Sequence, residues 1–328
     1  MYGIITYLRN KLFDCGILKQ QSHNVKIISV GNLRVGGTGK TPFVEYLIKS
    51  LSPNFNLAIL SRGYGRKTKG YIKLQPNHSA SEVGDEPLLL YKRNPNTLVA
   101  VCEDRNKGVE TLLKDSPNTN LIILDDAYQH RYINRDINIL LTEYNRPFFK
   151  DRVIPFGRLR EYRKGFKRAD YIVITKCPPL NQNQKQNFVN KLKAQPNQKI
   201  FFSNIVYKEP YHIKDKNKKI NLSDYKVILF TGIANNQHIV EYLNSITKVI
   251  NTITFPDHHN FTIKDKEAIK KLYDDNSLNK TILLTTEKDA MRLQDLETEI
   301  YVLPIDIEVH QYGKENPLIE KTIQEDVR

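Results

Sequence analysis

The chain has 328 residues, which suggests about two domains, each large enough to bury a core of its own. Its 50 lysines and arginines outnumber its 36 aspartates and glutamates, and the formal net charge of +14 favours acidic partners such as nucleotide phosphates, anionic lipid or nucleic acid. Three widely spaced cysteines without a Cys-x-x-Cys pair argue against a disulfide framework or a structural zinc site and fit a reducing cytoplasm, and no apolar run approaches the roughly 18 residues that span a bilayer.

Residues 1–19 predict an amphipathic helix. The residues that share its apolar face are Met1, Ile5, Leu8, Leu12 and Cys15. Two interpretations stay open: a helix packed on the domain, or a helix that lies in the membrane interface with its cations toward anionic headgroups. Apolar residues at helical spacing usually belong to a core, so composition alone favours the packed helix.

A glycine-rich loop between a strand and a helix is the most informative stretch of the chain. Residues 26–31 are short, β-branched and largely apolar, as in a buried parallel strand, and apolar residues recur at helical spacing from Phe43. The loop between them matches a phosphate-binding loop, in which backbone N–H groups converge on an anion, a lysine reaches the β- and γ-phosphates, and a threonine hydroxyl can ligate Mg²⁺. The standard pattern has another glycine at the position of Arg34, but three glycines remain. The candidate phosphate-binding residues are Arg34, Val35, Gly36, Gly37, Thr38, Gly39, Lys40 and Thr41.

Two later loops carry polar residues that could serve a site. Residues 61–67 follow a predicted strand and combine glycines, Tyr64 and three cations, which suits a phosphate or a sugar, although a solvated basic turn explains them equally well. Residues 84–87 open a predicted helix, because proline fits a first turn and acids suit the positive helix end. Asp85 is therefore either a helix cap or a general base that the helix dipole keeps ionised and that points at the phosphate loop.

A predicted strand at 121–124 ends in two carboxylates, Asp125 and Asp126. In a protein with a phosphate loop, a buried strand that ends in aspartate holds Mg²⁺ or its water shell opposite the threonine of the loop, which is Thr41 in this chain. The two motifs together are far more specific than either alone.

Alternating strands and helices predict the domain organisation. Further strands are expected at 97–102, 137–141 and 171–176, and they complete a doubly wound α/β domain whose ligands bind beyond the carboxyl ends of the strands. Residues 200–207 and a segment near Ile220 could pair as strands that link two lobes, and a second α/β unit has expected strands at 227–231, 249–255, 281–285 and 300–303. We therefore expect an N-terminal helix at 1–19, a phosphate-loop domain at 20–199, a two-stranded linker at 200–222 and a smaller α/β domain at 223–328.

The sequence Asp257-His258-His259 in the second unit invites a metal interpretation. Adjacent histidines point in different directions, and no third ligand has helical or hairpin spacing to them, so we predict no metal here. A histidine that pairs with a carboxylate is the better interpretation, and an ordinary loop histidine is the alternative.

Together these motifs resemble those of the tetraacyldisaccharide 4′-kinase family, the lipid A 4′-kinases of Gram-negative bacteria. The matching segments are residues 29–33, 36–42, 61–66, 84–87, 125–130, 159–161, 255–259 and 286–290. That family also lacks the first glycine of the general loop pattern, so Arg34 fits it. One segment departs from the family: this chain has Pro-Phe-Gly-Arg-Leu-Arg-Glu at 155–161, where Pro-Ala-Gly-Pro-Leu-Arg-Glu is more common, and the change could alter a contact on the substrate side.

The resemblance implies an α/β fold of two α/β/α sandwich lobes joined by a short two-stranded linker, with a P-loop NTPase-like sheet in the N-terminal lobe. It implies transfer of the γ-phosphate of ATP to the 4′-hydroxyl of a tetraacyldisaccharide 1-phosphate, which gives lipid IVA in lipid A and lipopolysaccharide biosynthesis. Mg²⁺ would be held by Thr41 with Asp125 or Asp126. Members are peripheral proteins of the cytoplasmic face of the inner membrane, and this favours the interfacial position for residues 1–19.

The resemblance also implies roles for individual side chains. Lys40 would offset the charge on the transferring group, Asp85 would accept the proton of the sugar hydroxyl, and His258 would pair with Asp85 or orient it. Further candidates for contact with substrate or phosphate are Tyr64, Arg105 and Glu161.

The main alternative from another class is a nucleotide-switch protein, such as a GTPase-like chaperone or targeting factor. Guanine-specific members usually carry Asn/Thr-Lys-x-Asp after a late strand, whereas Thr175-Lys176 is followed here by Cys177 and Pro178. A basic nucleic-acid binder is a third interpretation, but the chain has no known DNA- or RNA-binding signature. We therefore expect a lipid disaccharide substrate and the cytoplasmic leaflet as partners, with no nucleic acid and no stable protein partner.

Overall fold

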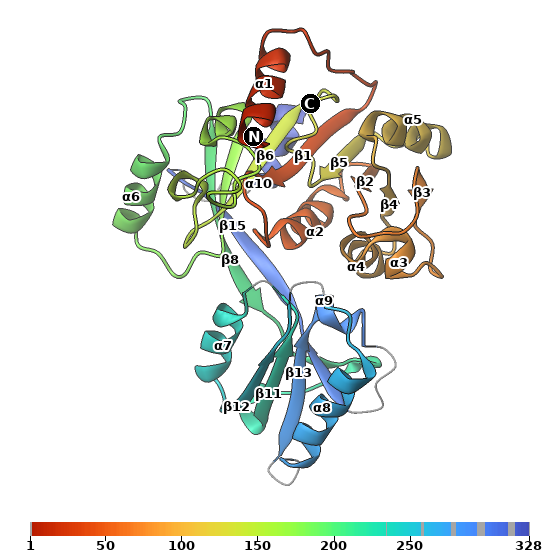
Figure 1. Cartoon of the computed structure of the whole chain (residues 1–328), viewed down its shortest axis with the longest axis vertical. Coiled ribbons are helices and arrows are strands. Elements are labelled where there is room, and N and C mark those ends of the chain that lie inside the picture. The colour runs from red at the N-terminus through yellow and green to blue at the C-terminus, as the bar shows by residue number, and fades with distance from the viewer. Residues whose placement is uncertain are drawn as a thin grey trace. The chain divides into compact units, whose positions relative to one another are not determined.

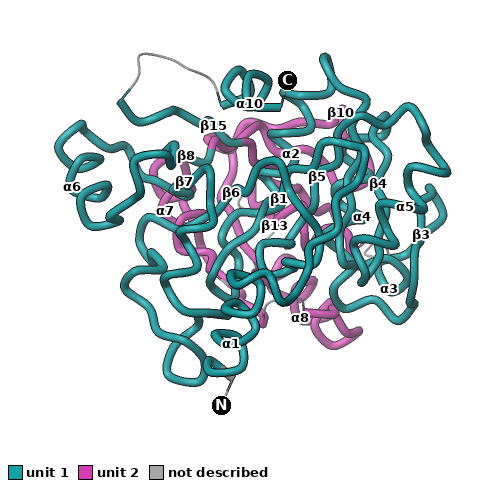
Figure 2. Tube along the Cα trace, turned by 90° about the horizontal axis from the view of Figure 1, so that it is seen from above, with its two compact units in different colours: residues 1–205, 307–328 teal, residues 206–306 magenta. Residues whose placement is uncertain are grey.

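A computed structural model of the chain forms two compact units (Figure 2). The first unit comprises residues 1–205 and 307–328, and the second comprises residues 206–306. The structure describes residues 2–233, 235–256, 259–276, 280–293, 299–313 and 319–327. Each unit is an α/β structure with its own sheet and core, which confirms the predicted fold class.

The first unit is built on a nine-stranded sheet with the strand order β15-β8-β7-β6-β1-β5-β2-β4-β3 (Figure 1). Its strands are β1 (Lys26–Asn32), β2 (Leu57–Ser61), β3 (Ile72–Lys73), β4 (Leu98–Val101), β5 (Leu121–Asp125), β6 (Ile137–Glu143), β7 (Tyr171–Thr175), β8 (Lys199–Tyr207) and β15 (Ile305–Gln311). Neighbours from β8 to β4 run parallel, and β3 is antiparallel to β4. The central strands are buried along their length, as expected of a parallel sheet that helices cover on both faces.

Helices cover both faces of this sheet. Those of the first unit are α1 (Tyr2–Asp14), α2 (Lys40–Leu51), α3 (Ala80–Val83), α4 (Asp85–Arg93), α5 (Arg105–Asp115), α6 (Gln182–Leu192) and α10 (Ile319–Val327). Apolar residues of α2, α4 and α10 pack on one face, and residues of α5 and α6 pack on the other. Side chains of one strand also point to both faces: Val30 of β1 belongs to the apolar cluster with α2, α4 and α10, and Ile27 belongs to the cluster with α5.

The second unit has a six-stranded sheet with the order β10-β9-β14-β13-β11-β12. Its strands are β9 (Tyr211–His212), β10 (Asp215–Lys219), β11 (Lys226–Thr231), β12 (Val249–Thr254), β13 (Thr281–Thr286) and β14 (Ile300–Leu303). The four strands from β14 to β12 are parallel, and β9 and β10 are antiparallel at the edge. Its helices are α7 (Gln237–Asn244), α8 (Ile263–Asp274) and α9 (Glu287–Ala290).

The expected boundary between the units is wrong at its C-terminal end. We expected residues 223–328 to form the second unit, but residues 307–328 belong to the first, because β15 lies next to β8 and α10 packs against α2. The expected pairing of residues 200–207 with a segment near Ile220 is also wrong. Strand β8 pairs with β7 and β15, and β10 (residues 215–219) pairs with β9 instead.

Among the described residues, no helix is both long and apolar enough to cross a bilayer.

Candidate active site

The glycine-rich loop joins β1 to α2 in the conformation that its glycines permit. Gly36 and Gly39 have φ angles of +112° and +83°, and Gly39 caps α2, which begins at Lys40. An L-residue with a side chain rarely adopts these angles, so the glycines set the path of the loop. The first backbone N–H groups of a helix have no acceptor within that helix, and they suit an anion.

Side chains from neighbouring strands hold this loop in place. The Thr175 hydroxyl at the end of β7 donates to the Thr38 carbonyl at 2.9 Å, and the Asn32 amide donates to the Thr38 hydroxyl at 2.5 Å. Lys176 Nζ donates to the Gly37 carbonyl and to the carboxylate of Glu143. Side chains outside the loop therefore hold it in place, and the backbone angles of its glycines set its path.

Asp126 is placed between two cations. Its Oδ1 lies 3.7 Å from Lys40 Nζ, and both of its oxygens accept from Arg160 Nη1, at 2.9 and 3.0 Å. Burial works against the charge on Asp126, but Lys40 and Arg160 outweigh that effect and hold its pKa below the usual range. The structure thus brings Lys40 and Asp126, which the sequence assigned to one site, into contact.

Asp125 lies one residue earlier, at the end of β5, and it is almost fully buried. It pairs in register with Val30 of β1, and its Oδ2 accepts from the Ser61 hydroxyl of β2 at 3.0 Å. Within the described part of the chain, no donor reaches its Oδ1. Burial raises the pKa of Asp125, and the negative charges of Glu86 and Asp126 raise it further.

These features suit a divalent cation. Asp125 is a carboxylate with a free buried oxygen and carboxylate neighbours, so a cation beside it would remove both the unsatisfied acceptor and the repulsion. The structure, over the residues that it describes, has no group of three or more acidic, histidine or cysteine side chains that could enclose a metal ion. Mg²⁺ typically uses only one or two carboxylates together with phosphates and water, so the donor set fits Mg²⁺ on a nucleotide.

Asp85 is buried and is the first residue of α4, and Gly84 is the cap of that helix. Gly84 packs against the loop that follows β2, where an added Cβ would lie 3.1 Å from the carbonyl oxygen of Tyr64. The first turn of α4 also faces Asp125, since Glu86 acts on the pKa of that residue. The cap interpretation of Asp85 is therefore wrong, and its helix begins beside the carboxylates of the site.

A loop after β6 closes against the glycine-rich loop. Val35 N–H donates to the Arg158 carbonyl at 2.8 Å, and Arg160 N–H donates to the Leu33 carbonyl at 2.7 Å. This pairing fixes the backbone of Arg160, whose guanidinium then reaches Asp126. Arg34, which stands where a glycine is usual, turns its guanidinium to Asp151 at 2.8 Å and Glu143 at 3.3 Å.

The remaining candidates differ in where they lie. Tyr64 is exposed, and Thr41 is the half-buried second residue of α2. Arg105 is only 2% exposed and donates to the carbonyls of Cys102 and Asp125. His258 lies outside the described residues.

Glu161 is buried, and its carboxylate is held by three side chains: Asn10 at 2.7 Å, Gln129 at 3.0 Å and Arg168 at 2.8 Å. These bonds leave Glu161, like Arg105, engaged within the protein. Both side chains are buried and form hydrogen bonds within the first unit.

Sequence reasoning missed four side chains that the structure adds to the site: Ser61, Glu86, Arg160 and Lys176. Three of them lie inside segments that the sequence analysis noted, and Lys176 directly follows β7, but none was assigned a role in the site. Their contacts join segments far apart in the chain, which no local pattern reveals.

A glycine loop that opens a helix, with a lysine facing paired aspartates at the end of the adjacent strand, defines a phosphate-loop nucleotide-binding enzyme. A family model described as tetraacyldisaccharide-1-P 4′-kinase matches residues 1–324. Curated proteins named tetraacyldisaccharide 4′-kinase match too: one from Bacteroides thetaiotaomicron is 39% identical over 100% of this chain and 92% of its own length, and one from Flavobacterium johnsoniae is 42% identical over 96% and 95%.

A crystal structure of LpxK from Aquifex aeolicus in complex with ATP is similar to this chain, with a TM-score of 0.76 and 32% identity over 100% of this chain and 96% of that one. The chain belongs to the tetraacyldisaccharide-1-P 4′-kinase family. Its activity is that of a tetraacyldisaccharide 4′-kinase in lipid A biosynthesis, and this decides between the kinase and the nucleotide switch in favour of the kinase.

Proposed function

We propose that ATP with Mg²⁺ is the phosphate donor, and that its γ-phosphate passes to the 4′-hydroxyl of a tetraacyldisaccharide 1-phosphate at the edge formed by the glycine-rich loop and the end of β5. The observation that carries this proposal is the contact of Lys40 with Asp126 at 3.7 Å, next to the unsatisfied oxygen of Asp125. The ATP that the Aquifex aeolicus structure holds supports the choice of nucleotide.

The chain would stabilise the transfer mainly by charge and position, because phosphoryl transfer has a loose transition state with charge spread over the moving group. Backbone N–H groups from Gly36 to Thr41 bind the phosphates, and Lys40 offsets the negative charge on the transferring group. Thr41 and Asp125 would hold Mg²⁺, which would supply positive charge to the phosphate oxygens. Arg160 acts through Asp126 and keeps that carboxylate ionised beside Lys40.

Asp85 is the proposed general base for the sugar hydroxyl. It is buried at the N-terminal end of α4, where the helix dipole favours the carboxylate form, and its neighbour Glu86 faces Asp125. The role that the family resemblance implies for His258, which is to orient Asp85, stays a prediction. Tyr64 is exposed beside Gly84 and is a candidate contact for the sugar, whereas Arg105 and Glu161 would position the site without touching substrate.

The experiment combines purified protein, γ-labelled ATP, Mg²⁺ and a disaccharide 1-phosphate acceptor in detergent, and it measures label on the lipid. Asp85→Asn should lower kcat by about 10²–10⁴-fold, because general-base help is typically worth that much, while the affinity for ATP stays the same. Near-normal turnover of Asp85→Asn would remove the base assignment. Transfer to another acceptor, with none to the disaccharide, would overturn the substrate.

We also propose that α1 lies in the membrane interface. Its inward face is formed by small and polar residues and one aromatic, since Gly3 contacts Val153, Asn10 bonds Glu161, and Phe13 is buried. Its apolar face turns away from the protein, and the residues exposed there are Ile4, Ile5, Leu8 and Leu12. An exposed apolar face on a helix with cations suits the boundary of a bilayer and supports a peripheral enzyme of the cytoplasmic leaflet.

A further inference from the structure

The segment that follows β6 presents cations and one aromatic ring to solvent. We call residues 152–168 the basic loop. It contains seven arginines and lysines and a single acid, Glu161, which is buried. Its exposed cations are Arg152, Arg158, Arg163, Lys164 and Lys167. Phe156 stands among them with 85% of its side chain exposed, the largest exposed fraction among the large apolar residues in the described part of the chain.

The backbone around Phe156 is fixed by hydrogen bonds, so its exposure is built into the fold. Phe156 N–H donates to the Val153 carbonyl at 3.0 Å, and Ile154 N–H donates to the Leu159 carbonyl at 3.1 Å. Asp151 Oδ1 accepts from the N–H groups of Arg152 and Arg158, at 2.8 and 3.1 Å.

Gly157 makes the turn at this tip possible. A Cβ at Gly157 would lie 2.3 Å from the Arg152 carbonyl oxygen, so no other residue fits the turn. The loop holds Phe156 in solvent and so forgoes the stabilisation that burial of this side chain would give. Its backbone is nevertheless fixed by the hydrogen bonds described above.

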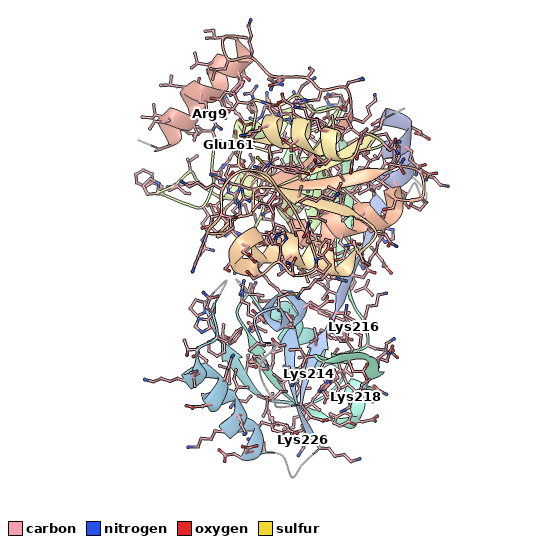
Figure 3. All side chains as sticks on the ribbon, turned by 90° about the vertical axis from the view of Figure 1, so that its right-hand side faces the viewer. Arg9, Glu161, Lys214, Lys216, Lys218 and Lys226 are labelled. Carbon is pink, nitrogen blue, oxygen red and sulfur yellow. The ribbon has the colours of Figure 1, made fainter. Side chains whose placement is uncertain are left out.

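The basic loop is continuous with α1. An added Cβ at Gly3 would lie 3.1 Å from Val153, and the rings of Tyr7 and Tyr162 meet edge to face at 5.8 Å. Arg9 of α1 and the buried Glu161 mark this junction in Figure 3. The apolar face of α1 and the basic loop therefore belong to one surface of the first unit.

The basic loop also reaches the catalytic edge. Leu159 bridges to Arg34 of the glycine-rich loop, and Arg160 bonds Asp126 beside Lys40. Only three residues along the chain thus separate the exposed Phe156 from Arg160, which bonds a site carboxylate.

We propose that the basic loop is a second contact with the membrane, in which Phe156 enters the acyl boundary of an anionic phospholipid bilayer beside α1 and the exposed cations meet its headgroups. An anionic bilayer is the occupant that fits both features, because the aromatic ring needs an apolar medium and the five exposed cations need negative charge. This inference rests on the proposed interfacial position of α1. It adds that the membrane is contacted by the same rigid loop that positions Arg160.

The test uses the full chain and sedimentation with lipid vesicles that contain no substrate, either purely zwitterionic or with an added fraction of anionic phosphatidylglycerol. Phe156→Ser should lower the partition coefficient by about tenfold, the effect expected when one aromatic side chain no longer leaves water. Arg158→Gln should lower it about fivefold on anionic vesicles only, since each cation near such a surface adds roughly 1 kcal/mol, and this loss should shrink in high salt.

The matched control is Ile263→Ser, which removes an apolar side chain that is 76% exposed at the start of α8 in the second unit. It should bind vesicles like the wild type. Leu8→Ser tests α1 separately. Thermal melting checks that each variant is folded, and transfer to a detergent-dispersed acceptor should stay at the wild-type rate in Phe156→Ser, because 85% of this side chain is exposed to solvent.

The outcomes separate the two proposals. Loss of binding in both Leu8→Ser and Phe156→Ser supports a surface made by α1 and the basic loop. Loss in Leu8→Ser alone, with Phe156→Ser equal to Ile263→Ser, overturns this inference and leaves the interfacial helix. Absence of vesicle binding by the wild type overturns both, while the transfer assay in detergent still measures the kinase chemistry independently.

Discussion

The two units have similar architecture and opposite electrostatic character. Each is a mainly parallel sheet with helices, and each places loops after the carboxyl ends of its strands. The first unit holds 36 lysines and arginines against 21 acids, a net charge of +15, and the second holds 14 against 15, a net charge of −1. Even the lysine-rich β10 of the second unit is partly neutralised, since Lys218, labelled in Figure 3, pairs with Glu299 at 2.5 Å.

The carboxylates at the two strand edges differ in the charges that surround them. In the second unit, Asp289 is fully buried, and its Oδ2 accepts from Gly232 N–H at 3.0 Å and from the Thr286 hydroxyl at 2.7 Å. Among the described residues, Asp289 and Asp125 each keep one buried oxygen without a hydrogen-bond donor, but Asp289 Oδ1 lies 3.9 Å from Arg292 Nη1. In the first unit, Asp125 has acidic neighbours instead, and Asp126 lies between two cations. The contrast shows that polar residues after a strand do not by themselves make a site. The first edge differs in charge, because acidic neighbours lie beside its buried carboxylate.

The strongest way to break this contrast is to remove the cation of the first unit. Lys40→Ala should lower kcat by about 10³-fold, because a charge aimed at the transition state in a shielded site is worth about that much. Lys226→Ala, which removes a lysine of the second unit, is the control and should turn over like the wild type. Steady-state transfer to the disaccharide acceptor measures both, and a loss below tenfold in Lys40→Ala would contradict the assigned role.

Arg160 sharpens the contrast, because it acts on the site through a carboxylate. Arg160→Gln should lower kcat about 10- to 100-fold, as is typical when a residue that orients a metal or phosphate site is lost. Arg160→Lys should recover only part of the rate, since a single ammonium replaces a planar guanidinium. Unchanged kinetics in Arg160→Gln would show that Asp126 needs no support from the basic loop.

Asp289 tests the opposite side of the comparison. Asp289→Asn should lower the free energy of unfolding of the second unit by about 1–3 kcal/mol, because Gly232 N–H and the Thr286 hydroxyl lose a charged acceptor in a buried place. Urea unfolding measures this change. Asp215→Asn, at an exposed position in β10, is the matched control and should unfold like the wild type. Equal stabilities of the two variants would mean that the buried carboxylate adds nothing.

The smallest expected effect concerns His130, which stands in the positive field of the first unit. Burial lowers its pKa to about 4, and the nearby charge of Arg105 contributes. The unfolded chain, with a histidine pKa of about 6.5, therefore binds more protons between these values, so the free energy of unfolding falls as the pH drops from about 6.5 to 4, by roughly 1 kcal/mol per pH unit. Denaturant titrations should show a shallower pH dependence for His130→Gln. Identical slopes would refute the effect.

The sequence indicated the parts of the site that depend on local order. The glycine spacing before Lys40 and the strand that ends at Asp125 follow from neighbouring residues, and register between β1 and β5 then brings them together. Arg160 could not be assigned in this way, because its place is fixed by backbone bonds to Leu33 in a distant segment. The same holds for Glu161, which was a candidate for contact with substrate and is enclosed by side chains from three segments.

The sequence also did not show in which direction the apolar face of α1 points. Helical spacing placed Ile5, Leu8 and Leu12 on one face, and all three are exposed. Spacing does not tell whether such a face meets the protein or leaves it. The contacts of Gly3 and Asn10 with the basic loop settle the inward side. The C-terminal return to the first unit was missed because pairing of β15 with β8 depends on residues about a hundred positions apart.

That return makes the second unit an insertion between β8 and β15. During synthesis the inserted unit can fold as soon as it has left the ribosome, whereas the nucleotide-binding unit lacks an edge strand and α10 until the last residues emerge. Removal of β15 or α10 therefore damages the unit that contains the glycine-rich loop, because β15 lies beside β8 and α10 packs against α2.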